Sequence, residues 1–184
     1  MADTYLRAIP PGKWYSWAAE YQLVPTTVAL NPMDFSAVDR YIRRNSINML
    51  IVGPEAPLVA GIVDYFLESN KHKDLVVIGP PKAGALLEGS KDFAKAFMAR
   101  HNIPTADYQT FKSGELKLAK AYLDKRKPPY VIKADGLSAG KGVIITEDRK
   151  EAESTLEDML KNSALGEAGA KVVSEQFMDG IEVS

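Results

Sequence analysis

Residues 129–146 read Pro-Tyr-Val-Ile-Lys-Ala-Asp-Gly-Leu-Ser-Ala-Gly-Lys-Gly-Val-Ile-Ile-Thr, which predicts a strand, a glycine-rich loop and a second strand. The two ends are rich in β-branched and aromatic residues, which favour strands. Lys133 precedes the loop, and Gly140, Lys141 and Gly142 lie within it. Glycine lets backbone N–H groups approach an anion closely, and lysine supplies a compact positive charge. We therefore predict that this hairpin closes over the phosphates of a nucleotide.

Two familiar phosphate loops do not fit this stretch. A Walker A loop has four residues between its first glycine and Gly-Lys-Ser/Thr, whereas Gly136 and Gly140 enclose only three. Gly142 stands where the magnesium-binding hydroxyl would be. The dinucleotide fingerprint fails because Ile145 replaces its last glycine. A surface hairpin with solvated lysines stays open as the alternative to a phosphate lid.

Composition narrows the class of protein. The 184 residues are 46% hydrophobic and 26% charged, as expected for a globular protein of one large or two small domains. The net charge of −1 gives no overall field for nucleic acid, and no apolar run is long enough to span a membrane. Cysteine is absent, which excludes thiolate sites and suits a reducing cytoplasm. We expect neither a nucleic-acid nor a membrane partner, and a cytoplasmic location.

The segment from Asp34 to Pro81 alternates helices and strands. Asp34 is predicted to cap a helix that ends near Asn45. A short buried strand is expected at 48–52 and another strand at 75–78, with a helix between them whose apolar face is Leu58, Ile62, Val63 and Phe66. This alternation predicts a parallel α/β layer.

Ligands of parallel sheets bind beyond the carboxyl ends of the strands. Gly53, Pro54 and Glu55 follow the first of these strands, so we predict a ligand site there. Residues 1–27, which contain Trp14 and Trp17, show no clean period and are predicted to be irregular.

The second half of the chain predicts further helices and a final strand. Helices are expected at 83–87, from the Ser90 cap to His101, at 113–127 and at 150–162, and a strand at 171–177. The pattern changes at a lysine-rich helix, a double proline and the glycine hairpin. We therefore expect one domain over residues 1–103, atypical at 1–27, and a second over 104–184.

Two further features have both a structural and a functional interpretation. Lys91 lies in the first turn of a predicted helix, where its charge opposes the helix dipole. A bound anion would explain this lysine, although an exposed lysine costs little. Glu175 and Glu182 are either solvated strand ends or parts of a nucleoside pocket, in which backbone groups at Glu175 and Phe177 read adenine and Glu182 accepts from ribose hydroxyls.

Four motifs together resemble the phosphoribosylamine–glycine ligase (glycinamide ribonucleotide synthetase) family of the ATP-grasp superfamily. They are Ile51–Val59, Leu87–Lys91, Val131–Val143 and Glu175–Glu182, and their order and spacing follow the family from about Val28 to Ser184. The resemblance implies an α/β fold, in which a partial pre-ATP-grasp (Rossmann-like) lobe precedes part of an ATP-grasp domain.

The resemblance also implies a function. The family joins 5-phosphoribosylamine to glycine in de novo purine synthesis, using ATP with Mg²⁺ (or Mn²⁺), by activating glycine as an acyl phosphate. Chemistry of this kind depends on positioning and on charge neutralisation around the γ-phosphate. The implied site residues are as follows: phosphate binding by Lys91, Lys133 and the lid Gly140, Lys141 and Gly142; adenine by Glu175, Gln176, Phe177 and Met178; ribose by Glu182; phosphoribosylamine near Gly53, Pro54 and Glu55.

The sequence departs from the family in two ways. The family's N-terminal Gly-Gly-Arg-Glu-His-type turn and its Ala-Pro-Gly-Asn-Ala-Gly segment are missing, with Ile9–Gly12 the nearest remnant. The magnesium ligands of the family would lie beyond Ser184, so no metal ligand is expected here. We therefore expect the 184-residue chain alone to be an incomplete, inactive ligase. A non-catalytic nucleotide-binding module and an ATP-grasp ligase for another acid stay open, although Gly53–Leu58 argues against the latter.

Overall fold

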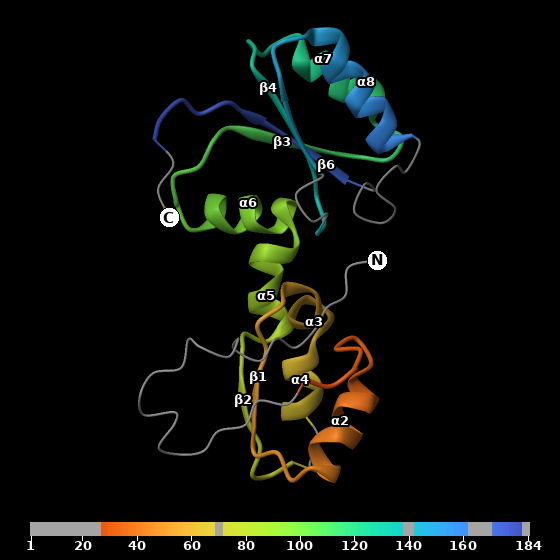
Figure 1. The fold of residues 1–184 in the computed structure, drawn as a ribbon. Coiled ribbons are helices and arrows are strands. Elements are labelled where there is room, and N and C mark those ends of the chain that lie inside the picture. The colour runs from red at the N-terminus through yellow and green to blue at the C-terminus, as the bar shows by residue number, and fades with distance from the viewer. Residues whose placement is uncertain (1–26, 69–71, 138–141, 162–170, 182–184) are drawn as a thin grey trace. The chain divides into compact units, whose positions relative to one another are not determined.

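The computed structural model describes residues 27–68, 72–137, 142–161 and 171–181. The chain forms two compact units, Met1–Gly79 and Pro80–Ser184, each with its own sheet (Figure 1). The boundary expected between residues 103 and 104 lies inside the second unit. The segment predicted to be irregular, residues 1–27, lies outside the described residues except for Thr27.

The first unit contains the predicted parallel layer. Its elements are α2 (Phe35–Arg44), β1 (Met49–Ile51), α3 (Glu55–Ala60), α4 (Ile62–Leu67) and β2 (Val76–Ile78). Strands β1 and β2 pair in parallel, with Met49 opposite Val76. The Asp34 cap is confirmed, since its carboxylate accepts a 2.9 Å hydrogen bond from the Ala37 N–H.

The helix predicted between the two strands is split. Its four apolar residues are buried as expected, but Gly61 ends α3 in a left-handed conformation with φ of +96°. A left-handed residue is most easily a glycine, because a Cβ would clash with the following carbonyl. The chain therefore starts a new helix, α4, on the same apolar stripe.

The expectation that the first strand is buried is wrong. Met49 and Ile51 of β1 are 49% and 61% exposed, and Val76 and Ile78 of β2 are 51% and 45% exposed. These four side chains share one face of the pair, since alternate residues of a strand point the same way and Met49 lies opposite Val76. An apolar run does not distinguish a strand that is covered on both faces from one covered on a single face.

The second unit is a four-stranded antiparallel sheet with helices. Its elements are α5 (Lys82–Gly89), α6 (Lys91–Arg100), β3 (Tyr108–Lys112), α7 (Leu116–Leu123), β4 (Tyr130–Ala134), β5 (Val143–Thr146), α8 (Arg149–Leu160) and β6 (Lys171–Gln176). The strand order is β3-β6-β4-β5. The hairpin of β4 and β5 is confirmed, with Lys133 opposite Val143. Strand β3 was not predicted.

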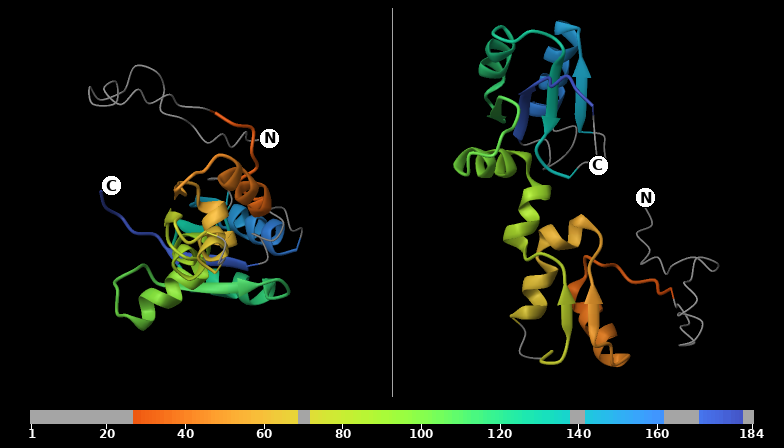
Figure 2. Two further views of the ribbon diagram at one scale, coloured as in Figure 1. Left: turned by 90° about the horizontal axis from the view of Figure 1, so that it is seen from below. Right: turned by 90° about the vertical axis from the view of Figure 1, so that its left-hand side faces the viewer.

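Helices α7 and α8 cover one face of this sheet. They pack against each other and against the strands, as Figures 1 and 2 show. The core between helices and sheet contains Ala119, Leu123, Tyr130, Ile132, Ala134, Ala152, Leu156 and Val172. Tyr130, Ile132 and Ala134 alternate along β4, so Val131 and Lys133 belong to the opposite face. No helix in the described part of the chain is long and apolar enough to cross a membrane.

Gly79, at the end of β2, is predicted to be intolerant of a side chain. Its φ is +156°, and a Cβ would lie 2.9 Å from Leu58 Cδ2 and 3.2 Å from Val63 Cγ2. Both neighbours are buried, so we expect Gly79→Ala to lower the free energy of unfolding of the first unit by about 1–3 kcal/mol. Urea unfolding followed by circular dichroism measures the change. Gly53→Ala, where a Cβ meets nothing within 4 Å, is the matched control. Equal stability of the two variants would contradict the prediction.

Candidate nucleotide-binding site

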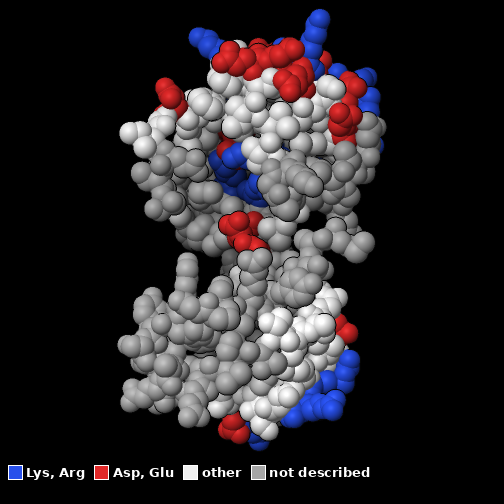
Figure 3. Space-filling view, in the orientation of Figure 1, with Lys and Arg blue, Asp and Glu red and all other residues white. Residues whose placement is uncertain are grey.

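The face of the second sheet opposite α7 and α8 carries two of the predicted site residues, Lys133 and Glu175. Lys133 on β4 lies opposite Val173 on β6, and Val131 lies opposite Glu175. Lys133 and Glu175 are therefore diagonal neighbours on one face, a spacing that long side chains can bridge. Figure 3 shows Lys and Arg side chains gathered in a recess of this unit, in the upper part of the view.

Helix α6 is tied to this face of the sheet by side chains of its first half. Lys95 is 3.3 Å from the Glu175 carboxylate, and Asp92 accepts hydrogen bonds from Thr110 and Lys171 at 2.8 and 2.7 Å. These contacts link α6 to both β3 and β6. The β4–β5 side of the same face stays more open, since Val143 and Ile145 are 38% and 55% exposed.

Glu175 is a buried carboxylate between two lysines. Its side chain is 7% exposed, and its Oε2 lies 3.0 Å from Lys133 Nζ and 3.3 Å from Lys95 Nζ. The interpretation of Glu175 as a solvated strand end is therefore wrong. A buried carboxylate is stable only when it is paired, which explains why two cations converge on it.

Lys91 and the start of the glycine loop are joined at the N-terminus of α6. Ser90 caps the helix by accepting from the Phe93 N–H at 3.1 Å, as predicted. Asp135, just after β4, accepts from the Asp92 N–H at 2.7 Å and from the Ser90 hydroxyl at 3.0 Å. Lys91 Nζ in turn donates to the Gly136 carbonyl at 3.2 Å. The half-buried Lys91 thus lies beside the root of the loop rather than free in solvent.

The hairpin itself is described only at its two ends. Gly140 and Lys141 lie outside the described residues, as does Glu182. Gly142 is buried, and its carbonyl accepts a 2.7 Å hydrogen bond from the Ala134 N–H, which closes the base of the loop. Lys133 is therefore held next to the point where the loop leaves the sheet.

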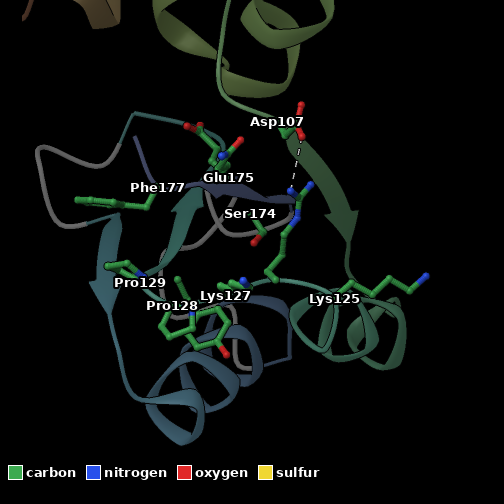
Figure 4. A pocket seen from close by; sticks show the side chains of 11 residues that line it. Asp107, Lys125, Lys127, Pro128, Pro129, Ser174, Glu175 and Phe177 are labelled. Carbon is green, nitrogen blue, oxygen red and sulfur yellow. Dashed lines mark ion pairs between the residues drawn. The ribbon is translucent and has the colours of Figure 1, made fainter. Parts of the chain in front are cut away.

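The predicted adenine segment leaves the end of β6. Gln176, Phe177 and Met178 are all exposed. Glu175, Gln176 and Phe177 also line a cavity of about 450 Å³, which Asp107 and residues 125–130, up to the first residue of β4, line as well (Figure 4). Arg126 pairs with Asp107 across this wall at 3.6 Å. The segment therefore borders open space and is not packed into the core.

Gly53, Pro54 and Glu55 are in the first unit, directly after β1. The Val52 N–H donates to the Ile78 carbonyl at 3.0 Å, so the parallel pairing continues up to this turn. Pro54 precedes α3, and Glu55 is its first residue. The three residues thus lie at the carboxyl end of a parallel pair, where the sequence placed them.

The described residues contain no group of three or more His, Asp or Glu side chains suited to a metal ion. Sequence reasoning missed Lys95, Asp92, Lys171 and Asp135 as parts of the site. Ser90-Lys91 stood out as a helix start, but Lys95 lies one turn further on with nothing local to mark it. Its importance comes from Glu175, a residue on another strand.

Asp92 is predicted to make the stability of the second unit depend on pH. Burial disfavours its charged form, but hydrogen bonds from Lys171 and Thr110 outweigh burial and lower the pKa of Asp92 below the usual 3.8. A carboxylate with a depressed pKa in the folded state contributes stability above its unfolded pKa, and this is lost as the pH falls through the folded pKa. We therefore expect Asp92→Asn to lose less stability than wild type when the pH is lowered from about 5 to 2.

Urea unfolding midpoints across this range measure that effect. Asp179→Asn, which removes an exposed carboxylate from the same unit, is the control. A wild-type slope in Asp92→Asn would show that the ion pair with Lys171 does not contribute to stability.

Comparisons with known proteins agree with this arrangement. Residues 17–88 match the phosphoribosylglycinamide synthetase N domain, and residues 89–184 match the ATP-grasp (A) domain of the same enzyme. The phosphoribosylamine–glycine ligase of Haemophilus influenzae is 50% identical over 157 residues, which cover 85% of this chain and 35% of that protein. The corresponding ligase of Pseudomonas putida is 54% identical over 139 residues, 76% of this chain and 31% of that protein. The chain thus spans about a third of the length of these relatives.

Comparison with solved structures also finds phosphoribosylamine–glycine ligase and proteins with a similar fold. The phosphoribosylamine–glycine ligase of Thermotoga maritima aligns with a TM-score of 0.56 and 30% identity, over 71% of this chain and 30% of that one. The biotin carboxylase domain of the Hydrogenobacter thermophilus 2-oxoglutarate carboxylase has a TM-score of 0.63 at 20% identity, over 83% of this chain and 34% of its own, and this shows the fold alone. The mixed α/β fold with an ATP-grasp part is confirmed, and the chain belongs to the phosphoribosylglycinamide synthetase family.

Proposed function

We propose that this chain provides nucleotide-binding parts of a ligase that joins 5-phosphoribosylamine to glycine at the expense of ATP, as the names of its relatives suggest. The observation that carries the proposal is the placement of Lys133. It projects from a strand next to the base of the glycine hairpin, on the open side of a sheet whose other face is filled. A cation and an adjoining glycine loop suit the phosphates of ATP.

The proposed roles are those that the resemblance to the family implies. Lys91 and Lys133 bind phosphate oxygens, and Gly140, Lys141 and Gly142 form the lid over them. Backbone groups of Glu175–Met178 border the adenine, Glu182 accepts from ribose, and Gly53–Glu55 lie near the phosphoribosylamine. Exposed Val143 and Ile145 supply apolar surface beside Lys133, which suits the flat face of a base.

This chain's own residues would act by positioning and by neutralising charge. In phosphoryl transfer, correct placement and cations around the transferred group provide most of the rate enhancement. Mg²⁺ would neutralise the γ-phosphate when ATP is bound, but the described side chains offer it no cluster of ligands. We therefore assign no magnesium ligand among them. The cytoplasmic location stays a prediction.

The test is an assay of the protein as it is isolated from its own cells, and not of the 184 residues alone, which are expected to be inactive. It is supplied with ATP, magnesium, glycine and freshly made 5-phosphoribosylamine, and ADP and glycinamide ribonucleotide are followed together. The proposal expects the two products in equal amounts, and neither product when glycine is omitted. ADP formation that requires a different acid would support another ATP-grasp ligase, and ATP binding without turnover would support a non-catalytic module. Either result would overturn the proposed reaction.

A further inference from the structure

We propose that Lys95 is a positioning residue that neutralises Glu175 and thereby leaves the positive charge of Lys133 available to the phosphates of ATP. This inference rests on the ATP site proposed above. It concerns a lysine that does not reach the ligand, and it assigns Glu175 a side-chain role in addition to any contact made by its backbone.

The ammonium group of Lys95 is buried, and the protein itself supplies its contacts. Its side chain is 8% exposed and its Nζ contacts Glu175 Oε2 at 3.3 Å. The same ammonium donates to Thr105 Oγ1 at 2.8 Å and to the Ala106 carbonyl at 3.3 Å, and it lies 5.5 Å from the centre of the Tyr108 ring. A lysine ammonium has three donors, and these three oxygens account for all of them. Lys95 therefore has no donor left for a ligand.

Lys133, unlike Lys95, is partly exposed to solvent. It shares Glu175 Oε2 with Lys95 at 3.0 Å, but its side chain is 27% exposed and lies beside the glycine hairpin. With Lys95 in place, two lysines share one carboxylate and the cluster keeps one net positive charge. Without Lys95, the charges of Glu175 and Lys133 would cancel, and this cluster would add no net charge to the surface offered to phosphate. Because charges interact more strongly at short range and in a partly buried site, the loss of this single charge should clearly weaken the attraction for phosphate.

This charge count predicts the order of ATP affinities in three variants. Lys95→Met leaves the cluster neutral and should weaken ATP roughly tenfold. Glu175→Gln removes the negative charge, so the net positive charge of the cluster rises by one. This variant should bind ATP more tightly than wild type. The double variant Lys95→Met/Glu175→Gln restores one net positive charge, and it should recover most of the affinity lost in Lys95→Met. A purely structural role for Lys95 predicts no such recovery, because the second substitution removes a further buried contact.

Calorimetric titration with Mg·ATP measures the four affinities, and Lys117→Met, which removes an exposed lysine on α7, is the control for net charge. A wild-type affinity in Lys95→Met would overturn the proposal, and so would a double variant no tighter than Lys95→Met. If Lys95→Met does not fold, the comparison of Glu175→Gln with wild type tests the proposal. Unchanged or weaker ATP binding by Glu175→Gln would contradict the charge count and overturn the proposal.

A second readout does not depend on ATP. Pairing with Glu175 shields the Lys133 amine, so its acylation by a small reagent, followed by mass spectrometry, reports how strongly the two are paired. We expect slower labelling of Lys133 in Lys95→Met and faster labelling in Glu175→Gln. If this pattern is found and no form of the protein binds ATP, the proposed function falls, and only the neutralisation of Glu175 by Lys95 stands. If ATP binds and the labelling rates do not change, the role of Lys95 falls alone.

Discussion

Replacing Lys133 by alanine is expected to weaken ATP binding by roughly ten- to a hundredfold. A hydrogen bond from an ammonium to a charged oxygen contributes about 1.5–3 kcal/mol, which corresponds to that range. Lys133 is held on β4 by pairing with both neighbouring strands, so its ammonium is already positioned before the ligand arrives. Its removal also leaves Glu175 with Lys95 as its cation, which lowers the local positive charge.

Calorimetric titration of wild type and variant with Mg·ATP measures the loss. Lys117→Ala on α7 is a matched control, since it removes the same charge from an exposed site and should bind ATP as wild type does. Intact secondary structure in the Lys133→Ala variant excludes unfolding as the cause. An unchanged affinity in a folded Lys133→Ala protein would show that phosphate is bound elsewhere.

Elements with a local signal could be predicted from the sequence. The Asp34 and Ser90 caps, the apolar stripe of α8 and the β4–β5 hairpin each depend on residues within about one turn or one loop of each other. Strand β3 has no such signal. Its partner, β6, comes from the far end of the unit. Each residue of β3 pairs with one of residues 171–175. The strand is therefore defined by tertiary pairing rather than by its own sequence.

The same distinction holds within the candidate site. The glycine hairpin and the lysine next to it were visible because they are adjacent in sequence. The cation pair at Glu175 was not, since Lys95, Lys133 and Glu175 come from a helix and two strands. Asp135 was part of a quoted motif, but its link to the α6 N-terminus depends on a contact 43 residues away. Proximity in the fold, which single-sequence patterns do not report, decides which charges share a partner.

The largest expected loss of stability is in Leu156→Ala. Leu156, on α8, is fully buried in the core between α7, α8 and the sheet. Truncating a buried leucine removes apolar contacts and leaves a cavity, so we expect the free energy of unfolding of the second unit to fall by about 2–5 kcal/mol. Leu118→Ala, on α7 and 62% exposed, is the matched control and should change stability by less than about 0.5 kcal/mol.

Hydrogen exchange read by mass spectrometry on peptides from β4 and β6 measures this loss in the second unit alone. These strands alternate core residues with site residues: Ile132 and Ala134 face α8, whereas Lys133 lies between them on the other face. A cavity in the core that these residues share should therefore speed exchange in the strand that holds Lys133. We expect ATP to slow that exchange again, because binding to the folded state alone stabilises it. If Leu156→Ala and Leu118→Ala exchange at the same rate in β4, the packing of α8 does not support the strand that positions the nucleotide site.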